Sequence, residues 1–359
     1  MIYAARRKKK MTRVSKISST QLLCLLILSR GVLSVAYGAF TQSGSLQSTA
    51  VSAGLAATVS LILCIPTLKL GRCGGCELRY GFGRASAAIY SLYFIYIITM
   101  TLTLFTVLRT ETSGLKVSIW ILPVGLLIAG IYGAYKGIEG IARAGALILF
   151  MVIAAIILLC LGLVSSSSWL KLAPVGAIKI SDIINESIIM IGEQSCIPAI
   201  IFLYPHVKGS VKASVSFWIL IVFASIAAMA VFIVSVLGDY TQTQSFPVYT
   251  WARLSSIGVI QRLDSVFMAV WAAGIFARLS LLLWSLKHSL RYALGRALSK
   301  RLCLLAVSLS GFAAVVVSIC AAYNSGIREA VLNGYILAAS TVICGAVLPI
   351  ILLIRRRYK

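Results

Sequence analysis

The chain has 359 residues, of which 60% are hydrophobic and only 12% are charged. Soluble domains have about 45–50% apolar residues, so this composition excludes an ordinary soluble protein and indicates one with several membrane spans. The net charge of +24 would suggest a nucleic-acid partner for a soluble protein. Because Lys and Arg collect in the cytoplasmic loops of membrane proteins, we expect no nucleic acid here.

Both ends of the chain are basic. Residues 1–16 include "ARRKKKMTRVSK", and residues 355–359 follow the last apolar run with three arginines and a lysine. We therefore predict that both termini are short cytoplasmic tails, weakly attracted to anionic membrane lipid. This orientation requires an even number of spans.

Apolar runs of about 20 residues, the length that crosses a bilayer, occur ten times. They cover residues 17–40, 46–68, 86–108, 117–135, 144–164, 183–203, 213–237, 266–286, 302–322 and 331–354. With both termini inside, 24 of the 33 Lys and Arg residues fall in cytoplasmic segments and 7 in outer ones. The sequence thus predicts an all-α polytopic membrane protein with ten transmembrane helices. One outer loop, 238–265, includes a predicted short helix at about 247–258.

The first apolar run carries a charge near its middle. Arg30 and Gly31 lie within "ILSRGVLSVAYGAF", and Ser34 keeps one face of the predicted helix small. An intramembrane charge is expensive and normally faces a partner or a cavity inside the bundle. We therefore predict that this part of the first span contributes to a site.

The sixth apolar run carries a carboxylate at its midpoint. Glu193 follows Gly192 and precedes Gln194, Ser195 and Pro198. A charge at this depth costs about 2.5–3.5 kcal/mol on insertion scales. Pro198 cannot donate a backbone hydrogen bond to the carbonyl of Gln194, so we expect the helix to break just after Glu193.

The charged, glycine-containing segments of the first and sixth runs occupy corresponding positions in two halves of the chain. Such a pair is typical of a binding site made by discontinuous helices, where irregular backbone lines a cavity. The alternative is that Arg30 and Glu193 simply pair and hold two helices together. Small residues in these runs also allow helices to pack closely.

Other intramembrane polar groups give weaker signals. Tyr93 and Tyr96 lie with Tyr90 and Thr99 on one face of the third run, where they could meet a ligand or simply pack. Arg278 lies about 12 residues into the eighth run, so we expect a structural or gating role, or a side chain that extends to the cytoplasmic interface. The predicted ligand-binding residues are Arg30, Gly31, Ser34, Tyr93, Tyr96, Gly192, Glu193, Gln194 and Ser195, with Pro198 and Arg278 as structural or gating residues.

The sequence contains no recognisable catalytic motif. Its two histidines, His206 and His288, lie at expected cytoplasmic ends of spans. Cys73 and Cys76 form a single CxxC, which is only half of a zinc site. We therefore predict no enzymatic activity, no cofactor and no bound metal.

The chain resembles the B-subunit family of spore germinant receptors, the endospore germination permeases of the amino acid–polyamine–organocation superfamily. The most specific match is "FPVYTWARLSSIGVIQRLDSVFMAVWAAGIFARLSLLLW", with supporting matches in "KISSTQLLCLLIL", "KGIEGIAR" and "FLYPHVK". The resemblance covers residues 16–357. The chain departs from the family in "TQSGSLQSTAVSAG" and in the Cys-containing loop 69–84, which affects the expected ligand and the outer contacts with partners.

The resemblance implies a LeuT-type fold of two inverted five-helix repeats, 17–164 and 165–354, with broken first and sixth helices. It also implies a multi-pass protein of the spore inner membrane that senses a nutrient germinant, often an amino acid, together with an A subunit and a lipoprotein C subunit. A secondary transporter of amino acids or polyamines, coupled to a proton or Na⁺, is the first alternative. A membrane subunit with a vestigial pocket is the second.

Overall fold

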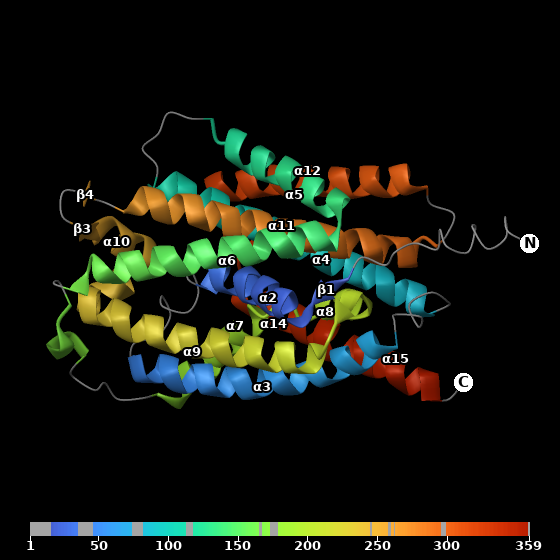
Figure 1. Cartoon of the computed structure of the whole chain (residues 1–359), viewed down its shortest axis with the longest axis horizontal. Coiled ribbons are helices and arrows are strands. Elements are labelled where there is room, and N and C mark those ends of the chain that lie inside the picture. The colour runs from blue at the N-terminus through green and yellow to red at the C-terminus, as the bar shows by residue number, and fades with distance from the viewer. Residues whose placement is uncertain are drawn as a thin grey trace, which may run out of the picture.

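We describe the chain from a computed structural model. It covers residues 16–34, 46–73, 82–112, 118–164, 167–172, 179–244, 246–257, 260–261, 263–295 and 299–357. The fold is almost entirely helical, and Figure 1 shows the long helices lying side by side along the length of the molecule.

Seven helical segments of the described residues are long and apolar enough to cross a membrane. Six are the long helices α3 (Leu46–Arg72), α4 (Phe82–Thr112), α6 (Ile138–Leu161), α9 (Val211–Leu237), α11 (Asp264–Ala293) and α12 (Lys300–Tyr323). The seventh runs through α13 (Ser325–Val331), α14 (Gly334–Val342), the π-helical turn η6 (Ile343–Val347) and α15 (Leu348–Arg357). The chain is therefore a multi-pass membrane protein, and each of these segments overlaps one of the predicted spans.

The other three predicted spans correspond to shorter helices. They are α2 (Ser19–Ser34), α5 (Ile121–Lys136), and the pair α7 (Ile180–Gly192) and α8 (Ala199–Leu203). The interruption between α7 and α8 falls where Pro198 predicted it. Outside the bundle, α10 (Pro247–Leu254) occupies the place of the predicted loop helix, and short 3₁₀ turns are η3 (Trp169–Leu172), η4 (Tyr204–His206) and η5 (Gly238–Thr243).

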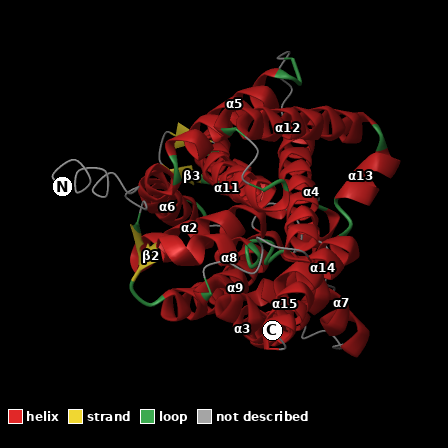
Figure 2. Ribbon diagram, turned by 90° about the vertical axis from the view of Figure 1, so that its right-hand side faces the viewer, coloured by secondary structure: helices red, strands yellow, loops and turns green. Residues whose placement is uncertain are grey.

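One helix, α11, organises the bundle. It packs against α4, α5, α6, α2 and α12, while α3 packs against α9 and α7. Figure 2 looks along the bundle and shows α11 enclosed by its neighbours, with the short α8 near the centre of the other half. The second part of the interrupted helix, α8, therefore lies in the interior of the protein.

Two short strand pairs, which were not predicted, fix the connections. β1 (Ile17–Ser18) pairs in parallel with β2 (Val207–Lys208), so the start of α2 is tied to the chain that follows α8. Gly209 has φ +104°, and a Cβ there would lie 3.0 Å from Ser19 Oγ, so this turn favours glycine. At the other end of the bundle, β3 (Ser256–Ile257) and β4 (Ile260–Gln261) form an antiparallel hairpin after α10.

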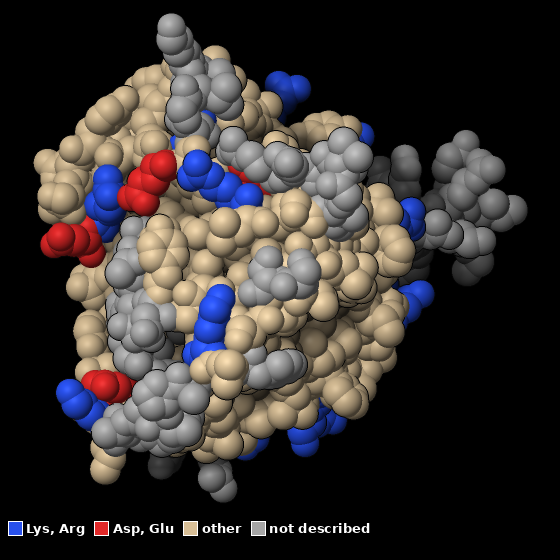
Figure 3. All heavy atoms as spheres, turned by 90° about the vertical axis from the view of Figure 1, so that its left-hand side faces the viewer, with Lys and Arg blue, Asp and Glu red and all other residues tan. Residues whose placement is uncertain are grey.

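The charged residues differ between the two ends of the bundle. Figure 3 looks onto the end that carries α10, where acidic and basic side chains are mixed. At this end Arg328 pairs with Glu111 at 3.3 Å, and both side chains are partly exposed. The opposite end carries the basic terminus of α15, as expected if the more positive end faces the cytoplasm. Cys76 lies outside the described residues, so the predicted CxxC pair is not described.

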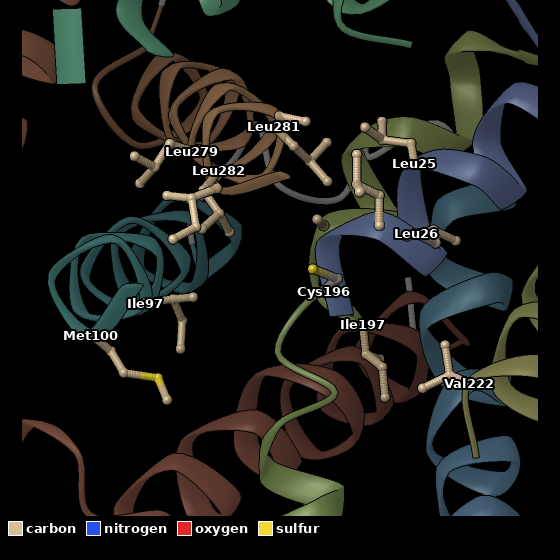
Figure 4. Close-up of a cluster of buried hydrophobic side chains, with 14 of the residues drawn as sticks. Leu25, Leu26, Ile97, Met100, Cys196, Ile197, Val222, Leu279, Leu281 and Leu282 are labelled. Atoms are coloured by element: carbon tan, nitrogen blue, oxygen red, sulfur yellow. The ribbon is translucent and has the colours of Figure 1, made fainter. Parts of the chain in front are cut away.

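The core extends into the interruption between α7 and α8. Figure 4 shows Cys196 and Ile197, on this interruption, among buried side chains of α2, α4, α9 and α11. Both residues are almost fully buried. The irregular backbone is thus surrounded by protein, which is the condition under which a membrane protein tolerates it.

Candidate functional site in the interrupted helix

The helix that begins at Ile180 ends at Gly192, and helix resumes at Ala199. Between them, the carbonyl of Gln194 accepts a hydrogen bond from the N–H of Ile197 at 3.0 Å. This three-residue turn replaces the helical bond that Pro198 cannot donate. The residues Glu193–Pro198 therefore place irregular backbone and polar side chains in the buried interior of the bundle.

An ion pair joins α2 to this interruption. Arg30 Nη2 lies 2.6 Å from Glu193 Oε2, and the two side chains are 0% and 8% exposed. The pairing that was considered as the structural alternative is therefore formed. It links the first predicted span to the sixth across the interior of the bundle.

A second guanidinium, that of Arg278, reaches the same interruption from α11. Its Nη2 donates to Ser195 Oγ at 2.7 Å, its Nε donates to Thr101 Oγ1 at 3.1 Å, and its Nη1 donates to the carbonyl of Ser29. Arg278 is completely buried, so the alternative of a side chain extending to the interface is wrong. Arg278 therefore connects α11 with α2, with α4 and with the interruption.

The charges around the interruption do not balance. Arg30 and Arg278 contribute two positive charges, and Glu193 contributes one negative charge. These three side chains therefore carry a net charge of +1 in the interior of the bundle. Such a site attracts a further anionic group more than a further cation.

The predicted tyrosines separate in the structure. Tyr93 OH donates to the carbonyl of Ser195 at 2.9 Å and lies 3.2 Å from Thr341 Oγ1, which itself donates to the carbonyl of Gly192 at 3.0 Å. Tyr96 OH instead donates to the carbonyl of Val331 at 3.3 Å. Tyr93 thus lies at the interruption, whereas Tyr96 supports the start of the last span.

Gln194 is the most unusual side chain of the interruption. It is fully buried, and its amide nitrogen and oxygen make no hydrogen bond with any described residue. Buried polar atoms are nearly always hydrogen-bonded, so such a group calls for an explanation. A primary amide offers both donors and an acceptor to a ligand.

The first span differs from its prediction at Gly31. α2 is helical from Ser19 to Ser34, so the helix is not interrupted at Gly31, and the expectation of irregular backbone at this residue is wrong. The Arg30 side chain reaches Glu193 from a regular helix, and no break is needed. The side chain of Ser34 and residues 35–45 lie outside the described residues.

Several residues of the site were missed by the sequence analysis. Ser29, Thr101, Cys196 and Thr341 all bond within it, but each is a common small residue in an apolar run. Outside these contacts, α7 carries another buried carboxylate, Glu186, which accepts from Ser48 Oγ of α3 at 3.1 Å. The sequence signal that could have identified Glu186 was its spacing from Glu193, seven residues or two helical turns earlier.

A cavity of about 240 Å³ lies beside α2, between α6, α9 and α11. Its lining is apolar and includes Gly31, Phe267 and Trp271. Among the predicted ligand-binding residues whose side chains the structure describes, only Gly31 lines it. An apolar group next to Arg30 could occupy this space, but the lining offers little to a charged one.

We expect Gly192→Ala to destabilise the protein by about 1–3 kcal/mol, because a Cβ at Gly192 would lie 2.6 Å from the backbone nitrogen of Ala338 on α14. Gly31→Ala is the matched control, since its Cβ would meet nothing within 4 Å and alanine favours the helix. Thermal unfolding of the two purified variants measures this difference. Equal melting temperatures would show that α7 and α14 do not approach so closely.

Comparison with known proteins gives one family. A family model described as spore germination protein matches residues 82–325, which include α4–α6, both parts of the interrupted helix, α9, α11 and α12. No curated protein matches the chain. The matched residues form more than half of the chain and contain the sequence Glu193–Pro198 and Arg278. The chain therefore belongs to the spore germination protein family, that of the germinant receptor B subunits.

Proposed function

We propose that this chain is the integral-membrane subunit of a spore germinant receptor. It binds a small nutrient germinant of the amino acid class in the middle of the bundle and signals to an A subunit and a lipoprotein C subunit. It lies in the spore inner membrane with both termini in the cytoplasm and has no enzymatic activity. The observation that carries the proposal is the buried Arg30–Glu193 ion pair at an interrupted helix.

Stability alone is a poor reason to retain this ion pair. Moving two charges out of water costs several kcal/mol per ion, and apolar residues of similar volume are often at least as stable. The adjacent Gln194 amide and the excess positive charge of Arg278 are also unfavourable in an empty, purely structural core. A ligand that bonds to these groups accounts for all three features together.

The helix contacts support the LeuT-type arrangement of two inverted repeats. If α2–α6 form one repeat and the helices from α7 to α15, without α10, form the other, their contacts correspond in pairs. The contact α2–α6 matches α7–α14, α4–α12 matches α11–α5, and α2–α9 matches α3–α8. α3 also packs on its counterpart α9, and α4 on its counterpart α11. An odd number of spans in each repeat gives the two repeats opposite orientations.

The ion pair suggests how binding produces a signal. A zwitterionic amino acid places its carboxylate against Arg30 and its ammonium group against Glu193. The direct contact between Arg30 and Glu193 is thereby replaced by two contacts with the ligand. Each buried charge keeps a partner of opposite sign, which limits the cost of separating the pair. Because Arg30 belongs to α2 and Glu193 to the interruption, separating them changes how the two repeats pack. The ligand shifts this equilibrium only by its differential affinity for the two packings.

Proteoliposomes that contain the chain alone test this proposal. A panel of radiolabelled amino acids is tested for binding and for uptake, and we expect saturable binding of one or more without accumulation. Glu193→Gln is expected to weaken this binding at least tenfold, while Glu329→Gln, at an exposed carboxylate, leaves it within twofold.

Other outcomes identify the alternatives. Uptake by the chain alone would identify a secondary transporter. An unchanged germination response in spores that carry Glu193→Gln would identify a subunit whose pocket has no role. Co-purification with two further membrane proteins supports the receptor.

A further inference from the structure

A second cavity, of about 600 Å³, is lined by none of the residues Glu193–Pro198 of the interruption. It is formed where the last turns of α5 and α11 meet the first turn of α12, and Figure 2 looks onto this end of the bundle. Its lining residues are Tyr135, Lys136, Lys287, Arg291, Arg301, Cys303 and Leu304. Its volume is within the range of pockets that bind small molecules.

The lining of this cavity is strongly basic. Four of its seven residues are cationic, they come from three helices, and no Asp or Glu is among the described residues that line it. Lys287 and Arg291 lie one turn apart on α11, a like-charge spacing that destabilises a helix. A bound anion would reduce the repulsion between these two positive charges.

Helix dipoles do not explain all of these cations. Lys136 and Arg291 lie in the last turns of α5 and α11, where a positive charge is favourable. Arg301 lies in the first turn of α12, where a positive charge is unfavourable and an anion is favourable. Its position is explained if an anion sits between it and the ends of α5 and α11.

Two of the helices that line the cavity, α5 and α12, also carry exposed apolar side chains. Ile128 on α5 is 63% exposed, and Leu305 and Leu309 on α12 are 57% and 70% exposed. Along each helix, these apolar residues follow the basic residues at its end in the direction of its middle. An anionic amphiphile fits these two surfaces, with its head among the basic residues and its apolar tails along the exposed side chains. Other basic pockets between transmembrane helices bind lipids in this way.

We propose that the basic cavity binds a phosphate-bearing anion, and that the exposed apolar side chains of α5 and α12 make the headgroup of an anionic phospholipid its source. Inorganic phosphate shares the chemistry of the headgroup but lacks the tails. The site is separate from the germinant site and does not depend on it.

Binding is measured on the full chain in detergent, by native mass spectrometry and by thermal unfolding, with added phosphatidylglycerol, phosphatidylcholine or inorganic phosphate. We expect phosphatidylglycerol to stay bound and to raise the melting temperature, and the other two to have little effect. Arg291→Gln with Arg301→Gln is expected to weaken binding at least tenfold. The control pair Lys208→Gln and Lys212→Gln removes the same charge from exposed positions and is expected to change it less than twofold.

Arg291→Lys with Arg301→Lys keeps the charge and is expected to retain binding even if the glutamine pair folds poorly. Equal loss in the glutamine pair and the control pair would overturn the site, because it would indicate attraction to the general surface charge. Stabilisation by inorganic phosphate alone would overturn the lipid as the source. Equal binding of phosphatidylcholine would overturn the role of the anion.

Discussion

Replacing Glu193 with Gln is expected to lower the free energy of unfolding by about 3–5 kcal/mol, because Arg30 is left as an uncompensated charge in the interior of the bundle. The double replacement Arg30→Met with Glu193→Leu removes both charges and is expected to unfold within about 1 kcal/mol of the wild type. Equilibrium unfolding in mixed micelles, followed by tryptophan fluorescence, compares the variants. The control Glu329→Gln changes an exposed carboxylate and is expected to have an effect below about 0.5 kcal/mol.

The same double variant separates the structural and functional roles of the pair. If the pair serves only to hold α2 against the interruption, a stable double variant responds to germinants as the wild type does. If the pair receives the germinant, the double variant is folded and silent. A normal germination response from this variant would therefore contradict the proposed site, whatever its stability.

Much of the fold could be predicted because hydrophobic run length and charge placement depend only on neighbouring residues. The ten apolar runs each correspond to one helix or to a few consecutive helices, and a proline at position 198 was enough to predict the interruption before α8. The β1–β2 pairing between Ile17–Ser18 and Val207–Lys208 could not be predicted in this way. It depends on two backbones that meet only after the bundle has formed.

The charged residues of the candidate site were the clearest to predict. Arg30, Glu193 and Arg278 are conspicuous in apolar runs, and the structure brings all three to the same interruption. Their partners, such as Thr101 and Thr341, bond across 177 and 149 residues of sequence, so no local pattern distinguishes them from other small polar residues. The continuity of α2 through Gly31 likewise depends on its neighbours, because glycine permits a break without requiring one.

Replacing Arg278 with Met is expected to destabilise the protein by about 3–5 kcal/mol. The guanidinium makes three hydrogen bonds to oxygens of α2, α4 and the interruption, and bonds to a charged group contribute about 1.5–3 kcal/mol each. Removing the charge also removes the free-energy cost of burying it, and this offsets part of the loss of the three hydrogen bonds. Arg278→Lys is expected to recover less than half of the loss, because an ammonium group cannot reach three oxygens in the planar geometry of a guanidinium.

Thermal unfolding of Arg278→Met and Arg278→Lys is compared with that of Arg253→Met, which removes an exposed arginine from α10 and is expected to melt as the wild type does. Stability alone does not show whether Arg278 also sets the position of Ser195 and hence of Glu193. Germinant affinity answers this, because Arg278→Lys keeps the charge near the site but not the bond geometry. If Arg278→Lys binds germinant as tightly as the wild type, the residue acts only through its charge, and the interruption does not need the guanidinium to hold its shape.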